Sequence, residues 1–184
     1  EKSIFMADSH GDLVCPNAIK VFKSFMEDWK PTHRIHLGDV WDFRSIRKGA
    51  GPEERAEGIR YDYNCGMELL DWYRPNYLTL GNHDYRLWRA GSETSNGVLA
   101  DLCAQKAQET EDEYEKYGSC VFGHVHTPND YEARHIDGGS AHAIGTMAQI
   151  DKMTYADAYT AKLGWRNSFA YGLHNSKTGE HKLW

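Results

Sequence analysis

Tyr77-Leu78-Thr79-Leu80-Gly81-Asn82-His83-Asp84 starts as an apolar run of strand length and ends in a turn crowded with side chains that can bind metal or carry protons. Three other apolar runs end in the same way. Residues 3–7 lead into Asp8-Ser9-His10, residues 34–37 into Gly38-Asp39-Val40-Trp41-Asp42, and residues 120–122 into Gly123-His124-Val125-His126. Loops at the carboxyl ends of parallel strands converge on one crevice in an open α/β sheet. We therefore expect the four clusters to form one site.

Length and composition are those of a folded domain. A chain of 184 residues suffices for one domain with a substantial core, so we expect a single domain over residues 1–184. The hydrophobic fraction of 40% and the charged fraction of 26% argue against disorder. The net charge of −6 and the lack of a Lys/Arg block disfavour general nucleic-acid binding, leaving only a local basic groove as an alternative.

The cysteines and the hydropathy of the chain bear on its compartment. Cys15, Cys65, Cys103 and Cys120 show no Cys-x-x-Cys spacing and read as reduced thiols. No apolar run approaches the length of a membrane span, and the first residues do not form a signal peptide. We expect a cytoplasmic protein without a membrane partner. The sequence leaves the oligomeric state open.

Helical periodicity predicts a helix that begins near Pro16, carries apolar residues up to Trp29 and ends before Pro31. It predicts a second helix from Pro52 to Tyr73 with Ala56 on its inward face, and a third over 98–117, after a turn at 92–97. The end of the chain changes character. Short alternating runs at 131–136, 141–147, 168–174 and 180–184 predict antiparallel strands, the last two joined by a hairpin loop at 175–179. We expect an α/β fold in which two packed sheets are flanked by helices.

The polar clusters combine carboxylate, amide and imidazole donors. The candidate ligands are Asp8, His10, Asp39, Asn82, His124 and His126. Mixed nitrogen and oxygen donors without thiolate suit Mn, Fe, Zn, Co or Ni better than Ca, and they exclude an iron–sulfur cluster. Two such ions roughly 3.5–4 Å apart activate a shared hydroxide and hold both oxygens of an in-line displacement at phosphorus. The donor set therefore predicts phosphoester hydrolysis.

The motifs Asp-x-His, Gly-Asp-x-x-Asp, Gly-Asn-His-Asp and Gly-His-x-His occur here in that order, each directly after an apolar run. In this the sequence resembles the calcineurin-like metallophosphoesterase superfamily over about the whole chain. The resemblance implies the superfamily's two-sheet β-sandwich flanked by helices, in an αββα arrangement. Parts of the sequence are similar to phage-encoded members of the superfamily. A phage-encoded protein would be located in the cytoplasm of the host.

Carried over residue by residue, the resemblance implies a binuclear site. Asp8, His10 and His126 would hold the first metal, and Asp39 would bridge to the second. Asn82 and His124 would hold the second metal, manganese being the expected ion at both sites.

The resemblance also implies an acid for the leaving group. His83 would face the substrate and protonate or stabilise the leaving oxygen, while Asp42 orients it as carboxylate partner. Asp84 is a second candidate for the orienting role.

One part of the superfamily pattern is missing. A lone His is expected between the third and fourth motifs, but no His occurs from Asp84 to Gly123. Three explanations compete: a natural short form with a weaker second site, a deletion, or a substitute ligand from elsewhere, for which His142 is best positioned. A lost ligand is expected to weaken the second site, because even outer-sphere losses cost about 10–100-fold in metal affinity.

The resulting functional prediction is a metal-dependent phosphoesterase, with a preference for phosphodiesters of small or nucleotide type. The first alternative is a DNA exonuclease or endonuclease of the same superfamily, with a basic groove beside the metals. The second is a metal-binding scaffold that has lost full catalytic competence. Arg44, Arg47 and Lys48 either meet a substrate phosphate or solvate their loop.

Overall fold

The computed structural model describes residues 1–93, 120–133, 139–157 and 160–184. Its first sheet has the strand order β3-β2-β1-β7-β8. The strands are β1 (Lys2–Met6), β2 (His33–His36), β3 (Tyr77–Leu78), β7 (Ala170–His174) and β8 (His181–Leu183). β1, β2 and β3 run parallel, while β7 pairs antiparallel with both β1 and β8.

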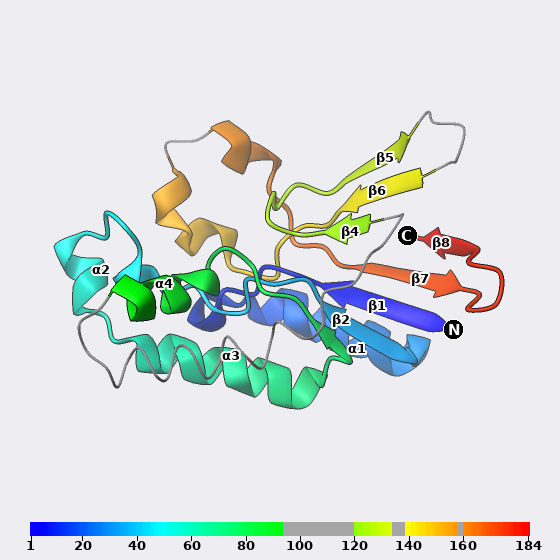
Figure 1. Ribbon diagram of the computed structural model, residues 1–184, viewed down its shortest axis with the longest axis horizontal. Coiled ribbons are helices and arrows are strands. Elements are labelled where there is room, and N and C mark those ends of the chain that lie inside the picture. Colours follow the sequence, from blue (N-terminus) through cyan, green and yellow to red (C-terminus); the bar gives the residue numbers. More distant parts are fainter. Residues whose placement is uncertain (94–119, 134–138, 158–159) are drawn as a thin grey trace.

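A second, three-stranded sheet has the order β4-β6-β5. It consists of β4 (Cys120–Phe122), β6 (Gly139–Ala143) and β5 (Asn129–Ala133), with β4 parallel and β5 antiparallel to β6. In Figure 1 this sheet lies on one side of the first sheet, and α1 (Pro16–Trp29) and α3 (Ile59–Tyr73) lie on the other. The predicted α/β architecture of two sheets with flanking helices is confirmed.

Buried side chains fill both sides of the first sheet. Ile4 and Met6 of β1 pack with Phe22 of α1 and with Leu69 and Tyr73 of α3. On the other side, a smaller cluster joins Ala7, Ile144 and Ala170. Alternation along a strand sends successive side chains to opposite faces, so β1 is buried on both of its faces. A strand held in this way fixes the loop that follows it.

The Tyr73 hydroxyl ties α3 to the sheet beneath it. It donates to the carbonyl oxygen of Ile4 at 3.1 Å and is also 3.0 Å from that of Ile35. Because Tyr73 is fully buried, both contacts are shielded from water, and burial raises the pKa of its phenol. The helix is therefore locked in register with β1 and β2.

The helices differ in part from the sequence prediction. The helix over 16–29 is confirmed, but the one predicted from Pro52 to Tyr73 is wrong, because it is broken into α2 (Pro52–Ala56) and α3. Gly58 is the N-cap of α3, and Ala56 is exposed, so it does not belong to the inward face. Glycine is tolerated at an N-cap and disfavoured inside a helix, which explains the break.

The chain after the Gly81 loop differs from the prediction in one respect. A helix, α4 (Tyr85–Glu93), follows the Gly81 loop, where the sequence predicted only a turn beginning at Ser92. The helix predicted over 98–117 lies outside the described residues. Short 3-10 turns at Gly11–Leu13, Arg44–Ile46, Ile150–Lys152, Thr154–Ala156 and Thr160–Gly164 complete the described elements.

The strands largely agree with the prediction, and the hairpin around 175–179 is confirmed by the antiparallel pairing of β7 with β8. The fourth cluster-bearing strand, β4, belongs to the second sheet rather than the first. The four polar clusters therefore follow strands of two different sheets. Among the described residues, no helix is both long and apolar enough to cross a bilayer.

Candidate metal centre

The loops after β1, β2 and β3 are joined by backbone hydrogen bonds. The amides of Asp8 and His10 donate to the carbonyl oxygens of Gly38 and Asp39, both at 3.0 Å. The His83 amide donates to Asp39 Oδ1 at 2.7 Å, which ties the third loop to the second. These hydrogen bonds therefore hold the three loops, which are far apart in sequence, together at one side of the site.

The fourth loop approaches from the second sheet. The His124 amide donates to both carboxylate oxygens of Asp8, at 3.0 and 2.8 Å, and the Arg166 amide donates to the carbonyl oxygen of His126 at 3.0 Å. These bonds hold the Gly-His-x-His segment over the end of β1. All four sequence clusters thus meet in one region.

Asp8, His10 and His126 form a buried group of potential ligands. One ligand atom from each lies within 4.8 Å of the others, and the residues are 1%, 0% and 3% exposed. His126 Nε2 is 3.3 Å from Asp8 Oδ1 and 3.4 Å from His10 Nε2. Two imidazole nitrogens and a carboxylate oxygen that are buried and face one another fit a transition-metal ion well. These are the three residues predicted for the first metal.

Asp42 orients two histidines at once. Its Oδ1 lies 3.2 Å from His10 Nδ1 and 2.5 Å from His83 Nδ1. Burial alone would raise the pKa of Asp42, but hydrogen bonds to His10 and His83 hold that pKa far below its usual range. A carboxylate on Nδ1 directs the Nε2 lone pair of a ligand histidine toward the metal. Asp42 therefore presents His10 Nε2 to Asp8 and His126.

His83 lies between Asp42 and an arginine that the sequence did not point to. Its Nε2 is 3.0 Å from Arg86 Nη2, and Arg86 Nη1 donates to the Asp42 carbonyl oxygen at 2.6 Å. Arginine only donates, so His83 Nε2 accepts and the ring proton resides on Nδ1. Burial lowers the pKa of His83 despite Asp42, in keeping with a neutral ring.

The position of Arg86 could have been inferred only with the helix known. It stands on the first turn of α4, whereas His83 lies in the turn before the helix, and the Arg86 amide donates to the His83 carbonyl oxygen at 3.0 Å. Because α4 was not predicted, the sequence carried no usable signal for this contact.

Asp84 holds the loops rather than the His83 ring. Its Oδ1 accepts from the Trp41 amide at 3.0 Å, and its Oδ2 accepts from the Gly81 amide at 2.9 Å. Burial raises the pKa of Asp84 to about 7, with the charge of Asp39 adding to the effect. The orienting contact to His83 comes from Asp42.

The residues predicted for the second metal are less closely gathered. Asp39 is buried, but Asn82 and His124 are exposed. Among the described His, Cys, Asp and Glu residues, neither Asp39 nor His124 belongs to a group whose ligand atoms converge within 4.8 Å. His142, the suggested substitute ligand, lies on β6 and lines a cavity with Asn129 and Trp184.

Backbone strain is concentrated in these loops. Asp8, His10, Asp39, His124 and His126 all have positive φ, between 52° and 72°. Left-handed conformations are uncommon for residues other than glycine and cost of order 1–3 kcal/mol each. Such strain persists where the surrounding structure enforces it and clusters at functional sites.

The motif glycines allow the carboxylates to approach. A Cβ on Gly81 would lie 2.0 Å from Asp39 Oδ1, and one on Gly123 would lie 2.4 Å from Asp8 Oδ2. A side chain at either position would displace a candidate ligand. The glycines are therefore spatial requirements of the site and not merely turn formers.

The aromatic residues of the last third divide between site and core. The Trp165 ring packs edge-on to His126, with centroids 4.4 Å apart, and the Tyr155 ring is 6.0 Å from that of His83. Phe169 and Tyr171 instead pack against α1 in the core. The guanidinium of Arg44 pairs with Asp12 and Glu57, and that of Arg47 pairs with Glu54, so both are matched by carboxylates.

Comparison with solved structures gives the class of the fold. A metallophosphoesterase from Sphaerobacter thermophilus is similar to this chain with a TM-score of 0.50 and 14% sequence identity, over 100% of this chain and 87% of that one. The chain therefore has the metallophosphoesterase fold. No family model and no curated protein matches the sequence.

Proposed function

We propose that this protein is a metal-dependent phosphoesterase. The observation that carries the proposal is that ligand atoms of Asp8, His10 and His126 converge in a buried position. Asp42 lies beside them and is hydrogen-bonded to both His10 and His83. The metallophosphoesterase fold supports it, since that fold brings together four loops whose residues suit this chemistry. Buried titratable groups paired in this way are typical of functional sites.

Asp8, His10 and His126 would hold one divalent transition ion, and Asp39, Asn82 and His124 would complete a second site. When bound, such ions act as Lewis acids and lower the pKa of coordinated water. Manganese is the proposed ion because the donors mix imidazole nitrogen with carboxylate and amide oxygen. The exposure of Asn82 and His124 favours a second ion that binds more weakly than the first.

His83 would serve the leaving group. Its Nε2 faces Arg86, and its Nδ1 is held by Asp42, so the ring has one fixed orientation. To act as the acid, Nε2 would exchange its contact with Arg86 for a proton taken from solvent. It would then pass this proton to the departing oxygen, while the Asp42 carboxylate stabilises the imidazolium. Arg86 would then be free to contact the phosphoryl oxygens, for which a guanidinium is well suited.

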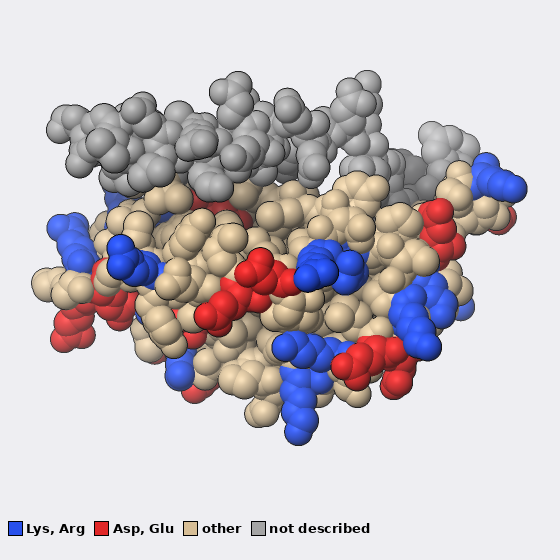
Figure 2. Space-filling model, turned by 90° about the horizontal axis from the view of Figure 1, so that it is seen from below, with Lys and Arg blue, Asp and Glu red and all other residues tan. Residues whose placement is uncertain are grey.

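The proposed substrates are phosphodiesters of small or nucleotide type. The nuclease alternative predicts a basic groove beside the metals. On the described part of the face with α1 and α3, basic and acidic side chains are interspersed, so this face offers no broad positive surface (Figure 2). Near the site, the Arg44 guanidinium is already neutralised by Asp12 and Glu57. Asn82 and His124, the residues proposed for the second metal, are exposed. This supports a second candidate function, a metal-binding scaffold that has lost full catalytic competence.

The test combines elemental analysis of protein purified without chelator with hydrolysis of bis-p-nitrophenyl phosphate and p-nitrophenyl phosphate in added manganese. Two ions per chain with turnover, faster on the diester, is the expected result. One ion per chain without turnover on either compound would support the scaffold instead. Turnover that persists after chelation would contradict a metal-dependent mechanism altogether.

A further inference from the structure

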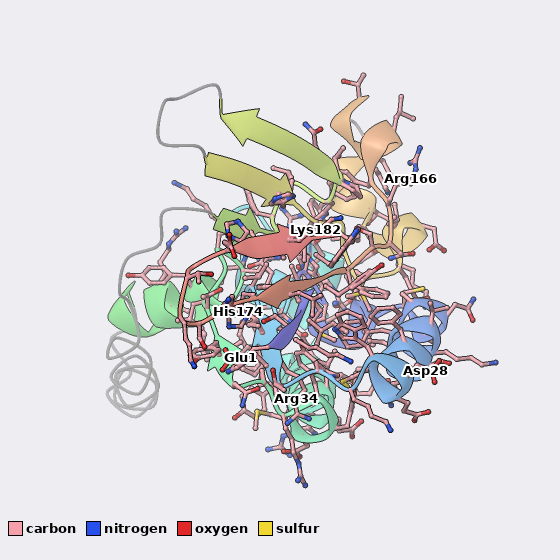
Figure 3. All side chains as sticks on the ribbon, turned by 90° about the vertical axis from the view of Figure 1, so that its right-hand side faces the viewer. Glu1, Asp28, Arg34, Arg166, His174 and Lys182 are labelled. Atoms are coloured by element: carbon pink, nitrogen blue, oxygen red, sulfur yellow. The ribbon has the colours of Figure 1, made fainter. Side chains whose placement is uncertain are left out.

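A second group of ligand-type side chains lies at the opposite end of the first sheet. Glu1, His33 and His174 each offer one ligand atom, and these atoms lie within 4.8 Å of one another. Glu1 lies seven positions before Asp8, which is roughly 20 Å of extended chain. Figure 3 looks onto this end, where Glu1 and His174 are neighbours. The group is therefore distinct from the metal centre.

Strand register places the three side chains on one face. Ser3 of β1 pairs with His33 of β2. The Glu1 nitrogen donates to the His174 carbonyl oxygen at 2.8 Å, and the His174 amide donates back to that of Glu1 at 3.0 Å. Paired residues share a face, and residues two apart on one strand do too. The convergence is a consequence of regular sheet geometry.

Neighbouring hydroxyls hold both rings. Ser3 Oγ is 3.2 Å from His174 Nδ1, and Thr32 Oγ1 is 3.1 Å from His33 Nδ1. The His33 ring also stacks on Tyr77, with centroids 6.3 Å apart. A polar partner on one ring nitrogen fixes the orientation of the other, as in metal sites whose histidines have outer-sphere partners. On His174 the other nitrogen, Nε2, is 2.6 Å from Glu1 Oε2.

We propose that Glu1, His33 and His174 bind a borderline divalent transition ion of the zinc type. Two imidazoles and a carboxylate form a zinc donor set and a poor one for calcium or magnesium. Tetrahedral zinc with bonds of 2.0–2.2 Å holds its donors about 3.4 Å apart, so modest side-chain rotation closes the group. The Glu1 and His174 side chains are 43% and 36% exposed, which gives an ion access and leaves a position for water.

An ion bound here would cross-link three adjacent strands. Glu1 extends β1, His33 opens β2 and His174 ends β7, so the donors come together only in the folded sheet. Binding to the folded state alone raises its stability, and at about 100 times the Kd the expected rise in Tm is roughly 5–10 °C. An ion pair between Glu1 and His174 accounts for the close approach of these two side chains. It does not account for the ligand atom of His33, which converges on the same point.

The test is calorimetric titration of zinc into the full chain after chelator treatment, with each variant first checked by circular dichroism. We expect wild-type protein to show one more class of site than His33→Gln/His174→Gln. Asp8→Asn/His126→Gln should keep this class and lose the one at the metal centre. Unchanged stoichiometry and affinity in His33→Gln/His174→Gln would overturn the proposal, whether or not the protein hydrolyses phosphoesters.

Single substitutions distinguish a three-ligand site from an ion pair. His33→Gln and His174→Gln should each weaken zinc binding at least tenfold and abolish the zinc-dependent rise in Tm. His181→Gln is the matched control, because His181 pairs with His174 on the same face but does not belong to the converging group. Loss of affinity in His174→Gln but not in His33→Gln would contradict the three-ligand site.

Discussion

The two ends of the first sheet carry similar donors in different surroundings. At the carboxyl end, Asp8, His10 and His126 are at most 3% exposed and have left-handed backbone. At the amino end, Glu1 and His174 are more than a third exposed. The ligand residues at the carboxyl end are buried and have strained backbone, as is typical of a site that performs chemistry. Those at the amino end are more exposed and unstrained, which suits a site that only binds an ion.

The partners of the donors differ just as much. At the carboxyl end a buried carboxylate, Asp42, orients His10 and His83. At the amino end the partners are the hydroxyls of Ser3 and Thr32. A carboxylate partner increases the basicity of a ligand histidine and can stabilise an imidazolium, whereas a hydroxyl mainly fixes the ring. Ligand types alone therefore do not define a catalytic centre.

The largest effect is expected from His83→Ala, at the carboxyl end. Loss of a positioned acid should lower turnover of phosphoesters by about 10²–10⁴-fold, while the bound metal is retained because Asp8, His10 and His126 are unchanged. Steady-state kinetics and elemental analysis measure both. His142→Ala is the control, since His142 lies on β6 and lines another cavity. Equal turnover in wild type and His83→Ala would exclude the assigned role.

Gly81→Ala tests how tightly the carboxyl end is packed. The new Cβ would lie 2.0 Å from Asp39 Oδ1 and 2.4 Å from the Asp39 amide nitrogen, so the loop must shift. We expect a loss of about 2–3 kcal/mol in the free energy of unfolding, measured in urea. Gly58→Ala, where a Cβ meets nothing within 4 Å, should cost less than about 1 kcal/mol. Similar losses in both variants would show that the close approach is unimportant.

A buried histidine makes the carboxyl end sensitive to pH. His36 Nδ1 accepts from the Gly38 amide at 3.2 Å, and burial lowers the pKa of His36 to about 4. The unfolded chain binds this proton near pH 6.5, so the stabilisation is complete above that value and is lost as the pH falls toward 4.

From pH 7 to pH 5, His36 should account for about 2 kcal/mol of the loss in unfolding free energy. The measurement is urea unfolding of metal-free wild type and His36→Gln at both pH values. The variant should be less stable at pH 7 but lose less on acidification. Identical pH dependence in the two proteins would mean that His36 is not held neutral by burial.

The smallest effect is expected at the amino end without metal. His174→Gln removes an exposed pair with Glu1, and such pairs contribute about 0–1 kcal/mol. Chelator-treated wild type and variant should therefore unfold within that margin in urea. A loss above 2 kcal/mol would show that the amino end is built into the fold and is not a surface site.

Local sequence determined the elements that have a strong apolar periodicity or clear proline and turn residues at their ends. Pro16 and the apolar spacing up to Trp29 predicted α1 correctly, and the hairpin at 175–179 followed from its turn residues. The prediction failed at Gly58, where a glycine interrupts a helical pattern, and over α4 (Tyr85–Glu93), for which no element was predicted.

The motifs by themselves indicated that Asp8 and His10 would lie at the carboxyl end of the first sheet, because a polar residue directly after a buried strand has only one end of its sheet to occupy. That His126 joins them from a strand of the second sheet is seen only in the structure. Tertiary structure alone decided how they meet: that Asp42 serves two histidines, that Arg86 faces His83, and that Asp84 caps backbone amides. It also brought Glu1, His33 and His174 together, 173 positions from first to last. Such contacts depend on register and on loop conformation, which are set by long-range packing and leave no local pattern in the chain.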